Sequence, residues 1–214
     1  FPKVRAISLT QATELGTIYG LEDFLAVKEI SKRNGLKLHL DGARFANAVA
    51  QLEVSPRELI DASGADALSF GTTKNGSPSG DAVVIFDKDL AGEFAYRRKQ
   101  AGQLASKMRY LAAPWLALLK DDLWLRNARQ ANAIAERLRV KLSEIPEVRV
   151  LFPREANSVF ADIPEKAQAA LRAKGWLFYV FIGKTGCRLM CSWDLTEQDV
   201  EDFVADLREA LATE

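Results

Sequence analysis

Lys74 and Asp41 are the two residues of this chain whose types and positions fit a defined chemistry. Lys74 lies in Ser-Phe-Gly-Thr-Thr-Lys-Asn-Gly (69–76), where an apolar run gives way to a glycine turn. An earlier apolar run, residues 36–40, ends in Asp41-Gly42-Ala43-Arg44. In enzymes that use pyridoxal phosphate, a Lys amine forms a Schiff base with the cofactor, and an Asp carboxylate keeps the pyridine nitrogen protonated so that the ring accepts electrons. The order and spacing of these strand-end residues therefore predict a pyridoxal phosphate site.

Simpler interpretations exist for both residues. A loop Lys most often lies in solvent without a partner, and Asp41 is placed to cap a helix expected at 44–52. The capping role is compatible with binding to the cofactor ring. Gly42 and Ala43 are expected to be small so that ring and backbone can approach closely.

The elements that carry these residues alternate between strand-like and helical patterns over the first hundred residues. Ser55-Pro56-Arg57-Glu58 has the sequence of a capping box and opens one of the helices. The expected strands are 4–9, 36–40, 67–70 and 82–86, and the other expected helices are 21–34 and 44–52. This alternation predicts an α/β fold with a mostly parallel sheet.

The strand at 36–41 is expected to have one polar face. Strand periodicity places Lys37, His39 and Asp41 together, opposite three leucines. Either the strand lies at an edge of the sheet with one wet face, or the polar face looks into a ligand pocket at the carboxyl end of the sheet. We favour the pocket, with His39 in a supporting or structural role below the cofactor ring.

The second half of the chain is mainly helical and then mixed. Long helices are expected at 88–106 and 114–140, and the second is apolar on more than one stripe, which is typical of a core or subunit interface. Strands are expected at 148–152, 158–163, 176–182 and 188–193, and helices at 165–174 and from Thr196 onward. We therefore expect residues 1–145 to form part of a cofactor-binding large domain with interface helices, and residues 146–214 to form a small C-terminal α+β domain.

Composition narrows the classes of partner. The chain has 29 Lys and Arg against 29 Asp and Glu, so nothing in the charge predicts nucleic acid or an anionic membrane as a partner. No apolar run reaches the length of a transmembrane helix. Cys187 and Cys191 lie about 13 Å apart along one expected strand, too far to bridge each other. With a single His and no Cys-x-x-Cys, no structural zinc site is expected, and a reducing, cytoplasmic setting fits best.

Three segments of the chain resemble the low-specificity L-threonine aldolase family, which belongs to the aspartate-aminotransferase fold (fold type I) of pyridoxal phosphate enzymes. They are Leu38-His39-Leu40-Asp41-Gly42-Ala43-Arg44, Phe70-Gly71-Thr72-Thr73-Lys74-Asn75-Gly76 and Arg97-Arg98-Lys99. The resemblance runs in order over essentially the whole chain. The Lys74 loop departs from the commoner Ser-Lys-Gly-Leu-Gly form and indicates a second branch. Family members also have a long N-terminal stretch with the phosphate-cradling loop, so we expect these 214 residues to be part of a longer chain.

The resemblance implies a role for each candidate residue in the first domain. Lys74 is the Schiff-base amine and Asp41 the partner of the pyridinium nitrogen. Thr72 donates its hydroxyl to the cofactor phosphate, or alternatively caps a turn. Arg44 helps to hold the cofactor and the substrate carboxylate, a bidentate task suited to guanidinium, or alternatively lies on a surface helix face.

The resemblance also implies a carboxylate-binding Arg in the small domain, at Arg188, for which a local ion pair is the alternative. Lys99 and Arg109 lie on a segment from which family members reach the active site. The spacing differs here, and a solvated basic helix face is the favoured interpretation.

The function that these features imply is a pyridoxal phosphate-dependent aldolase. Its substrates would be L-β-hydroxy-α-amino acids such as threonine and allo-threonine, cleaved to glycine and an aldehyde. The alternatives are a β-eliminating lyase that uses the same Lys and Asp, and a catalytically inert fragment of the same fold. The active protein is expected to be a homodimer or homotetramer with the site at the subunit interface.

Overall fold

The computed structural model describes residues 3–212, which divide into two compact units. The first unit comprises residues 3–13 and 18–126, and the second comprises Glu14–Thr17 and residues 127–212. The change of unit therefore falls within a long helix, α7 (Leu123–Ser143), rather than after it at the expected residue 145. Most of α7 packs into the second unit because its apolar side chains, such as Ile134 and Leu138, belong to the core of that unit.

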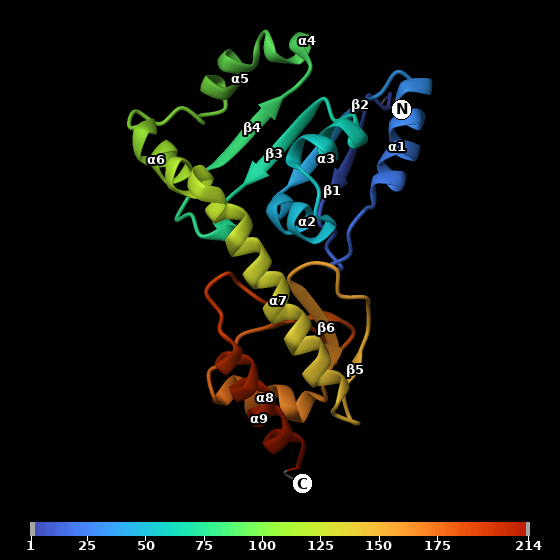
Figure 1. Ribbon diagram of the computed structural model, residues 1–214, viewed down its shortest axis with the longest axis vertical. Helices are drawn as coiled ribbons and strands as arrows, with labels where there is room; N and C mark the ends of the chain where they lie inside the picture. Colours follow the sequence, from blue (N-terminus) through green and yellow to red (C-terminus); the bar gives the residue numbers. More distant parts are fainter. Residues whose placement is uncertain (1–2, 213–214) are drawn as a thin grey trace. The chain divides into compact units, whose positions relative to one another are not determined.

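The first unit is built on a four-stranded sheet with the order β1-β2-β3-β4 (Figure 1). Its strands are β1 (Ala6–Thr10), β2 (Lys37–Gly42), β3 (Ala67–Gly71) and β4 (Asp81–Ile85). The first three run parallel and β4 is antiparallel to β3, so the prediction of a mostly parallel α/β sheet is confirmed. Parallel strands bring their carboxyl ends to one edge of the sheet, where Asp41 and the residues leading to Lys74 emerge.

Helices cover the apolar face of this sheet. They are α1 (Leu21–Arg33), α2 (Phe45–Leu52) and α3 (Pro56–Ser63), close to the expected ranges. Leu38 and Leu40 of β2 are fully buried on that face. The capping box of α3 is confirmed, because Glu58 N donates to Ser55 Oγ at 3.1 Å and Ser55 N donates to the Glu58 carboxylate at 2.7 Å.

Two of the expected long helices are wrong. The range 88–106 contains two short helices, α4 (Lys88–Ala91) and α5 (Phe94–Gln100), because the chain turns at Gly92 and again at Gly102, where φ is +72°. The range 114–140 contains the end of α6 (Met108–Leu119), a 3-10 turn at Lys120–Asp122 and most of α7. There the break arises because Asp121 and Asp122 adopt left-handed backbone conformations, which Asp tolerates better than most residues.

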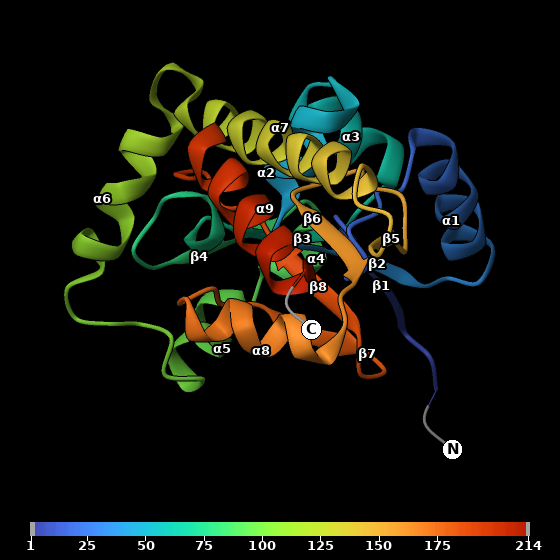
Figure 2. The same ribbon diagram turned by 90° about the horizontal axis from the view of Figure 1, so that it is seen from below.

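The second unit is an antiparallel sheet covered by helices. The strand order is β5-β6-β8-β7, and Figure 2 shows α9 between α7 and α8. The strands are β5 (Arg149–Val150), β6 (Ser158–Asp162), β7 (Tyr179–Ile182) and β8 (Gly186–Met190), and the helices are α8 (Glu165–Ala173) and α9 (Glu197–Ala212). The expected strand at 176–182 begins only at Tyr179, because Trp176 packs edge-on against Phe203 and donates from Nε1 to Asp206 at 2.7 Å.

Cys187 and Cys191 of the second unit are both buried and form no disulfide with each other. Burial raises the pKa of the Cys187 thiol to about 11 and that of the Cys191 thiol to about 12. Among the described helices, none has the length and apolarity needed to cross a membrane.

Candidate active site

Asp41 is half-buried at the carboxyl end of β2, and one of its two carboxylate oxygens accepts a hydrogen bond within the chain. Its Oδ1 accepts a hydrogen bond from the backbone N–H of Ala43 at 3.0 Å, and no other residue in the described range bonds to Oδ2. Asp41 is not the N-cap of α2, because that position belongs to Arg44. The carboxylate is therefore oriented by its own loop and keeps one oxygen for a ligand.

Two close approaches bring the Asp41 loop against the end of β3. A Cβ on Gly42 would lie 2.6 Å from Leu68 and 2.8 Å from the Ser69 carbonyl, so only glycine fits between the strands. A Cβ on Gly71 would lie 3.0 Å from the Ala43 Cα atom. Glycine is therefore required at position 42 because a larger residue would collide with the neighbouring strand β3. The contact at Gly71 places the segment that leads to Lys74 beside the segment that follows Asp41.

Lys74 lies in a 3-10 turn (Thr73–Asn75) whose ends are tied together by hydrogen bonds. Asn75 N and Ser77 N both donate to the Thr72 carbonyl, at 2.8 and 3.2 Å, and Gly76 follows with a φ of +104°. The Lys74 side chain is exposed and makes no hydrogen bond or ion pair with any residue between 3 and 212. An amine held on a rigid loop without a partner is suited to covalent chemistry.

Thr72 fixes this loop through its side chain. Its buried hydroxyl donates to the Gly80 carbonyl at 2.8 Å, which closes the segment between them. A hydroxyl has one proton, and here that proton is already donated. Thr72 makes no side-chain hydrogen bond that caps the 3-10 turn itself, and its contact with the cofactor phosphate stays a prediction.

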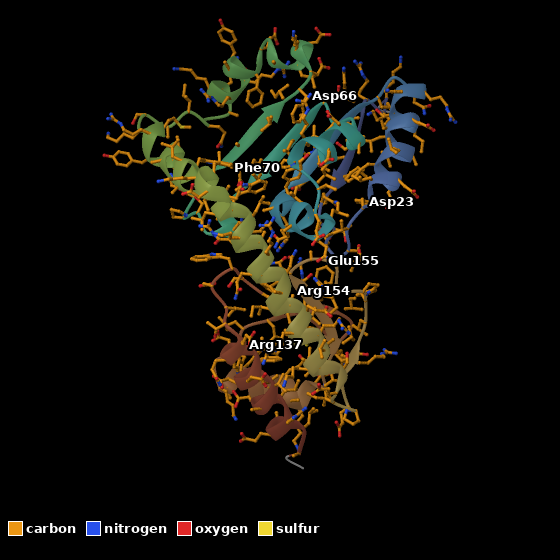
Figure 3. All side chains as sticks on the ribbon, viewed as in Figure 1. Asp23, Asp66, Phe70, Arg137, Arg154 and Glu155 are labelled. Atoms are coloured by element: carbon orange, nitrogen blue, oxygen red, sulfur yellow. The ribbon has the colours of Figure 1, made fainter. Side chains whose placement is uncertain are left out.

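The Lys74 loop is anchored by Asn75 and by an aromatic cluster around Phe70, and neither was predicted from the sequence. Asn75 is buried, and its Nδ2 donates to the Trp124 carbonyl at 2.8 Å. Phe70, labelled in Figure 3, makes edge-on contacts with Trp115 and Trp124 at centroid distances of 5.1 and 5.4 Å. The Lys-Asn-Gly sequence was the available signal, because a buried Asn beside a turn glycine is typical of a loop held by side-chain hydrogen bonds.

The polar face of β2 does not arise from an edge position, because β2 lies between β1 and β3. His39 is held at both ring nitrogens, with Nδ1 2.8 Å from Ser8 Oγ and Nε2 2.9 Å from Ser69 Oγ. At the far end of the strand Lys37 pairs with Asp87 and Asp66, and these carboxylates, Asp87 first, raise the pKa of its amine. His39 is therefore engaged within the sheet and is not available as a base.

Arg44 lies on the strand-to-helix turn, as the sequence predicts. It occupies the N-cap position of α2, where its carbonyl accepts from Asn47 N at 3.0 Å, and its side chain is half-buried. Lys99 and Arg109 both have exposed side chains, on α5 and α6.

Arg188 of β8, in the second unit, is a partly buried cation that forms no ion pair with any residue between 3 and 212. It lies against the rings of Phe160 and Phe181, with its guanidinium carbon 5.7 and 5.5 Å from their centroids. Its Nε is buried and has no hydrogen-bond partner in the described part of the chain. Burial lowers the pKa of this guanidinium, and the nearby charge of Glu14 opposes the shift only in part.

Arg188 also lines a hollow of about 300 Å³ together with Arg172, Tyr179 and Met190. Within residues 3–212 no carboxylate lies within ion-pairing distance of Arg188, and Glu14 acts on it only as a nearby charge.

Comparison with protein-family models identifies the family of this chain. The family model described as beta-eliminating lyase matches residues 1–166. The chain belongs to the beta-eliminating lyase family. That family match covers Asp41, the Lys74 loop and all of the first unit.

Two curated relatives of this family are similar over nearly the whole chain. The low specificity L-threonine aldolase of Pseudomonas aeruginosa is 52% identical over 208 residues, which are 97% of this chain and 60% of the relative. A protein of the same description from Pseudomonas sp. (strain NCIMB 10558) is 50% identical over 99% of this chain and 61% of the relative. The chain thus spans about three fifths of the length of these relatives.

Solved structures agree with the fold. A threonine aldolase from Leishmania major matches with a TM-score of 0.88 and 27% identity, over 97% of this chain and 61% of that protein. Tryptophan decarboxylase from Catharanthus roseus matches with a TM-score of 0.71 at 20% identity, over 95% of this chain and 48% of that protein, which supports the fold alone. The expected fold type I architecture is confirmed by these matches.

Proposed function

We propose that this protein is a pyridoxal phosphate-dependent aldolase that cleaves L-threonine-type β-hydroxy-α-amino acids to glycine and an aldehyde. The observation that carries the proposal is the position of Lys74 and Asp41 on two adjoining segments at the ends of β3 and β2. An exposed, unpartnered amine lies on a rigid loop that begins beside Ala43, and a carboxylate with one open oxygen precedes Ala43 by two residues. The names of the relatives, low specificity L-threonine aldolase, support the substrate class.

The residues present fit the cofactor. When bound, pyridoxal phosphate supplies an electron sink for the electron pair released as the Cα–Cβ bond breaks. Lys74 Nζ would hold it covalently, and Asp41 Oδ2 would accept a hydrogen bond from the protonated ring nitrogen. Gly71 and Ala43, where the Lys74 and Asp41 segments meet, have no bulky side chains that would block a ring between Lys74 and Asp41.

Two guanidinium groups are proposed for the carboxylate of the amino acid. Arg44 follows Asp41 on the same turn, so it lies beside the proposed ring position. Arg188 offers a buried Nε without a partner, and a carboxylate would compensate the cost of burying that charge. A planar guanidinium binds a carboxylate through two parallel hydrogen bonds, which fixes the orientation of the substrate.

Lys74→Ala tests the assignment of the amine. The purified protein should gain visible absorbance with pyridoxal phosphate, and borohydride reduction should leave the cofactor on the peptide that contains Lys74. The variant should lose turnover with an unchanged melting temperature, because the exposed side chain has no partner to lose. Lys32→Ala, a change at another exposed lysine, is the matched control. Parental turnover in the Lys74 variant would refute the assignment.

Product analysis separates the proposed reaction from the alternatives. An aldolase forms glycine and an aldehyde, whereas a β-eliminating lyase forms a 2-oxo acid and ammonia. A protein that stays colourless with added pyridoxal phosphate would support the inert alternative. We further propose a homodimer or homotetramer with the site at a subunit interface, and a cytoplasmic location in keeping with two cysteines that form no disulfide with each other.

A further inference from the structure

His39 ties three parallel strands together directly below Asp41. Its Nδ1 lies 2.8 Å from Ser8 Oγ on β1, and its Nε2 lies 2.9 Å from Ser69 Oγ on β3. Ser8 is the register partner of His39, and Ser69 is the register partner of Asp41 (Figure 1 shows the three strands side by side). His39 and Asp41 are two residues apart on one face, about 6.6 Å along the strand.

The protons of this row have two arrangements. A neutral imidazole has one N–H and one acceptor nitrogen, and each serine hydroxyl has one proton. If Nε2 carries the proton, Ser8 donates to Nδ1 and His39 donates to Ser69, so the Ser69 proton is left for another acceptor. If Nδ1 carries the proton, Ser69 donates to His39 and the Ser8 proton is left instead.

The neighbouring charge favours the first arrangement. Asp41 is the carboxylate next to Ser69 on the shared face, and its Oδ2 has no hydrogen-bond partner among residues 3–212. The other charged group of that face on β2, Lys37, is occupied by Asp66 and Asp87 at the opposite end of the strand. In the first arrangement the free hydroxyl proton is on Ser69, the register partner of Asp41, which is the end of the row nearer to that anion.

We propose that His39 is a positioning residue of the site: as the Nε2–H tautomer, it holds the Ser69 hydroxyl with its proton directed toward the carboxylate of Asp41. The row thereby helps to orient the Asp41 carboxylate. This role rests on the proposed function, since it gives Asp41 its importance. It differs from a merely structural tie, in which the direction of the protons does not matter.

The tautomer can be measured without cofactor or substrate. His39 is the only histidine of the chain, so its two ring nitrogens give the only imidazole signals in a long-range ¹H–¹⁵N spectrum. We expect the pattern of an Nε2–H tautomer at neutral pH in the cofactor-free protein. An Nδ1–H pattern, or the averaged pattern of a freely exchanging ring, would overturn the proposal even if the protein proves to be an active aldolase.

A matched pair of serine variants tests the link to Asp41. Ser8→Ala and Ser69→Ala each remove one hydroxyl from the same imidazole, on opposite sides. The dissociation constant of pyridoxal phosphate, followed by absorbance, should rise about tenfold in Ser69→Ala, because a hydrogen bond or dipole directed at a charged group is lost. In Ser8→Ala it should rise about twofold at most, since only an O–H bond to a neutral ring nitrogen is removed. Equal effects in the two variants would indicate a structural tie only and overturn the proposal.

His39→Gln and His39→Leu complete the design. The amide of Gln can donate to Ser69 and accept from Ser8, so Gln should retain most of the cofactor affinity, whereas Leu should lose as much as Ser69→Ala. Unfolding temperatures measured in parallel show whether each variant is folded. A parent protein that binds no pyridoxal phosphate would contradict the proposed function, and the tautomer measurement would still decide the present inference.

Discussion

At the scale of single residues, Asp41 gives the sharpest expectation. In Asp41→Asn the amide oxygen can still accept from Ala43 N–H, so the loop should keep its shape. The amide has no negative charge to hold a proton on the ring nitrogen. We expect a protein that still becomes coloured with pyridoxal phosphate and whose turnover falls at least about a hundredfold. Absorbance measured on the variant checks cofactor binding, and the reaction rate of the same sample checks the loss of turnover. Turnover equal to that of the parent would contradict the electron-sink role of Asp41.

Arg188 is the second residue with a clear expectation. Replacing it with Leu removes a charge whose burial is only partly compensated in this unit, so the melting temperature should stay level or rise. The KM for the amino acid should rise tenfold or more, by an estimate of about 1.5–3 kcal/mol for a charged hydrogen bond. Arg172→Leu, at an exposed arginine of the same hollow, is the comparison. A KM that changes equally in both variants would argue against a dedicated carboxylate ligand.

At the scale of elements, Asp206 joins α9 to the segment between α8 and β7. It accepts from Lys174 Nζ at 2.7 Å and from Trp176 Nε1 at 2.7 Å, and these two hydrogen bonds, Lys174 first, lower the pKa of its carboxyl. A group with a lowered pKa in the folded state contributes stability above its unfolded pKa and loses it as the pH falls through the folded one. The same pairing raises the pKa of Lys174, so that contribution is present below about pH 10 and is lost at higher pH.

Asp206→Asn should therefore melt below the parent at neutral pH, and the difference should shrink as the pH falls below the unfolded pKa of about 3.9 and disappear below the lowered folded pKa. Asp202→Asn, one helical turn earlier on α9 and bonded only to Gln198, is the control and should track the parent throughout. Melting curves between pH 2 and 9 check this. A difference between parent and Asp206→Asn that persists unchanged into acid would show that the charge of Asp206 is not the stabilising feature.

At the scale of the whole molecule, α6 carries the expected subunit contact. Leu116 is 78% exposed and Tyr110 is 69% exposed, an unusual exposure of large apolar side chains on one helix. We expect the parent to be a dimer or larger by light scattering and Leu116→Arg to be smaller, because a buried unpaired charge disfavours association. Val140→Arg, at an exposed apolar residue of α7, should leave the mass unchanged. A parent that is monomeric and active would refute the assembly.

The amino-acid pattern alone was sufficient to predict most elements and the strand-end positions of Asp41 and Lys74, whose chemical roles stay a prediction. Alternating runs, capping boxes and the strand-end positions of Asp41 and Lys74 are local signals, and α3 with its Ser55–Glu58 box formed as expected. The helix expected from Thr196 onward also formed, as α9, with Thr196 hydrogen-bonded to Asp199 at its start. Local signals carry through because capping and turn geometry depend on neighbours within a few residues.

Tertiary structure decided the rest, since it depends on partners distant in the chain. The hydroxyl of Thr72 is committed to Gly80, the loop is anchored through Asn75 to Trp124, and His39 is held between serines of two other strands. The single helix expected at 114–140 is broken because the Asp121–Asp122 backbone turns, which composition did not reveal. Sequence determined which residues could do chemistry, and the packing of strands and loops determined which of their polar atoms remain open for it.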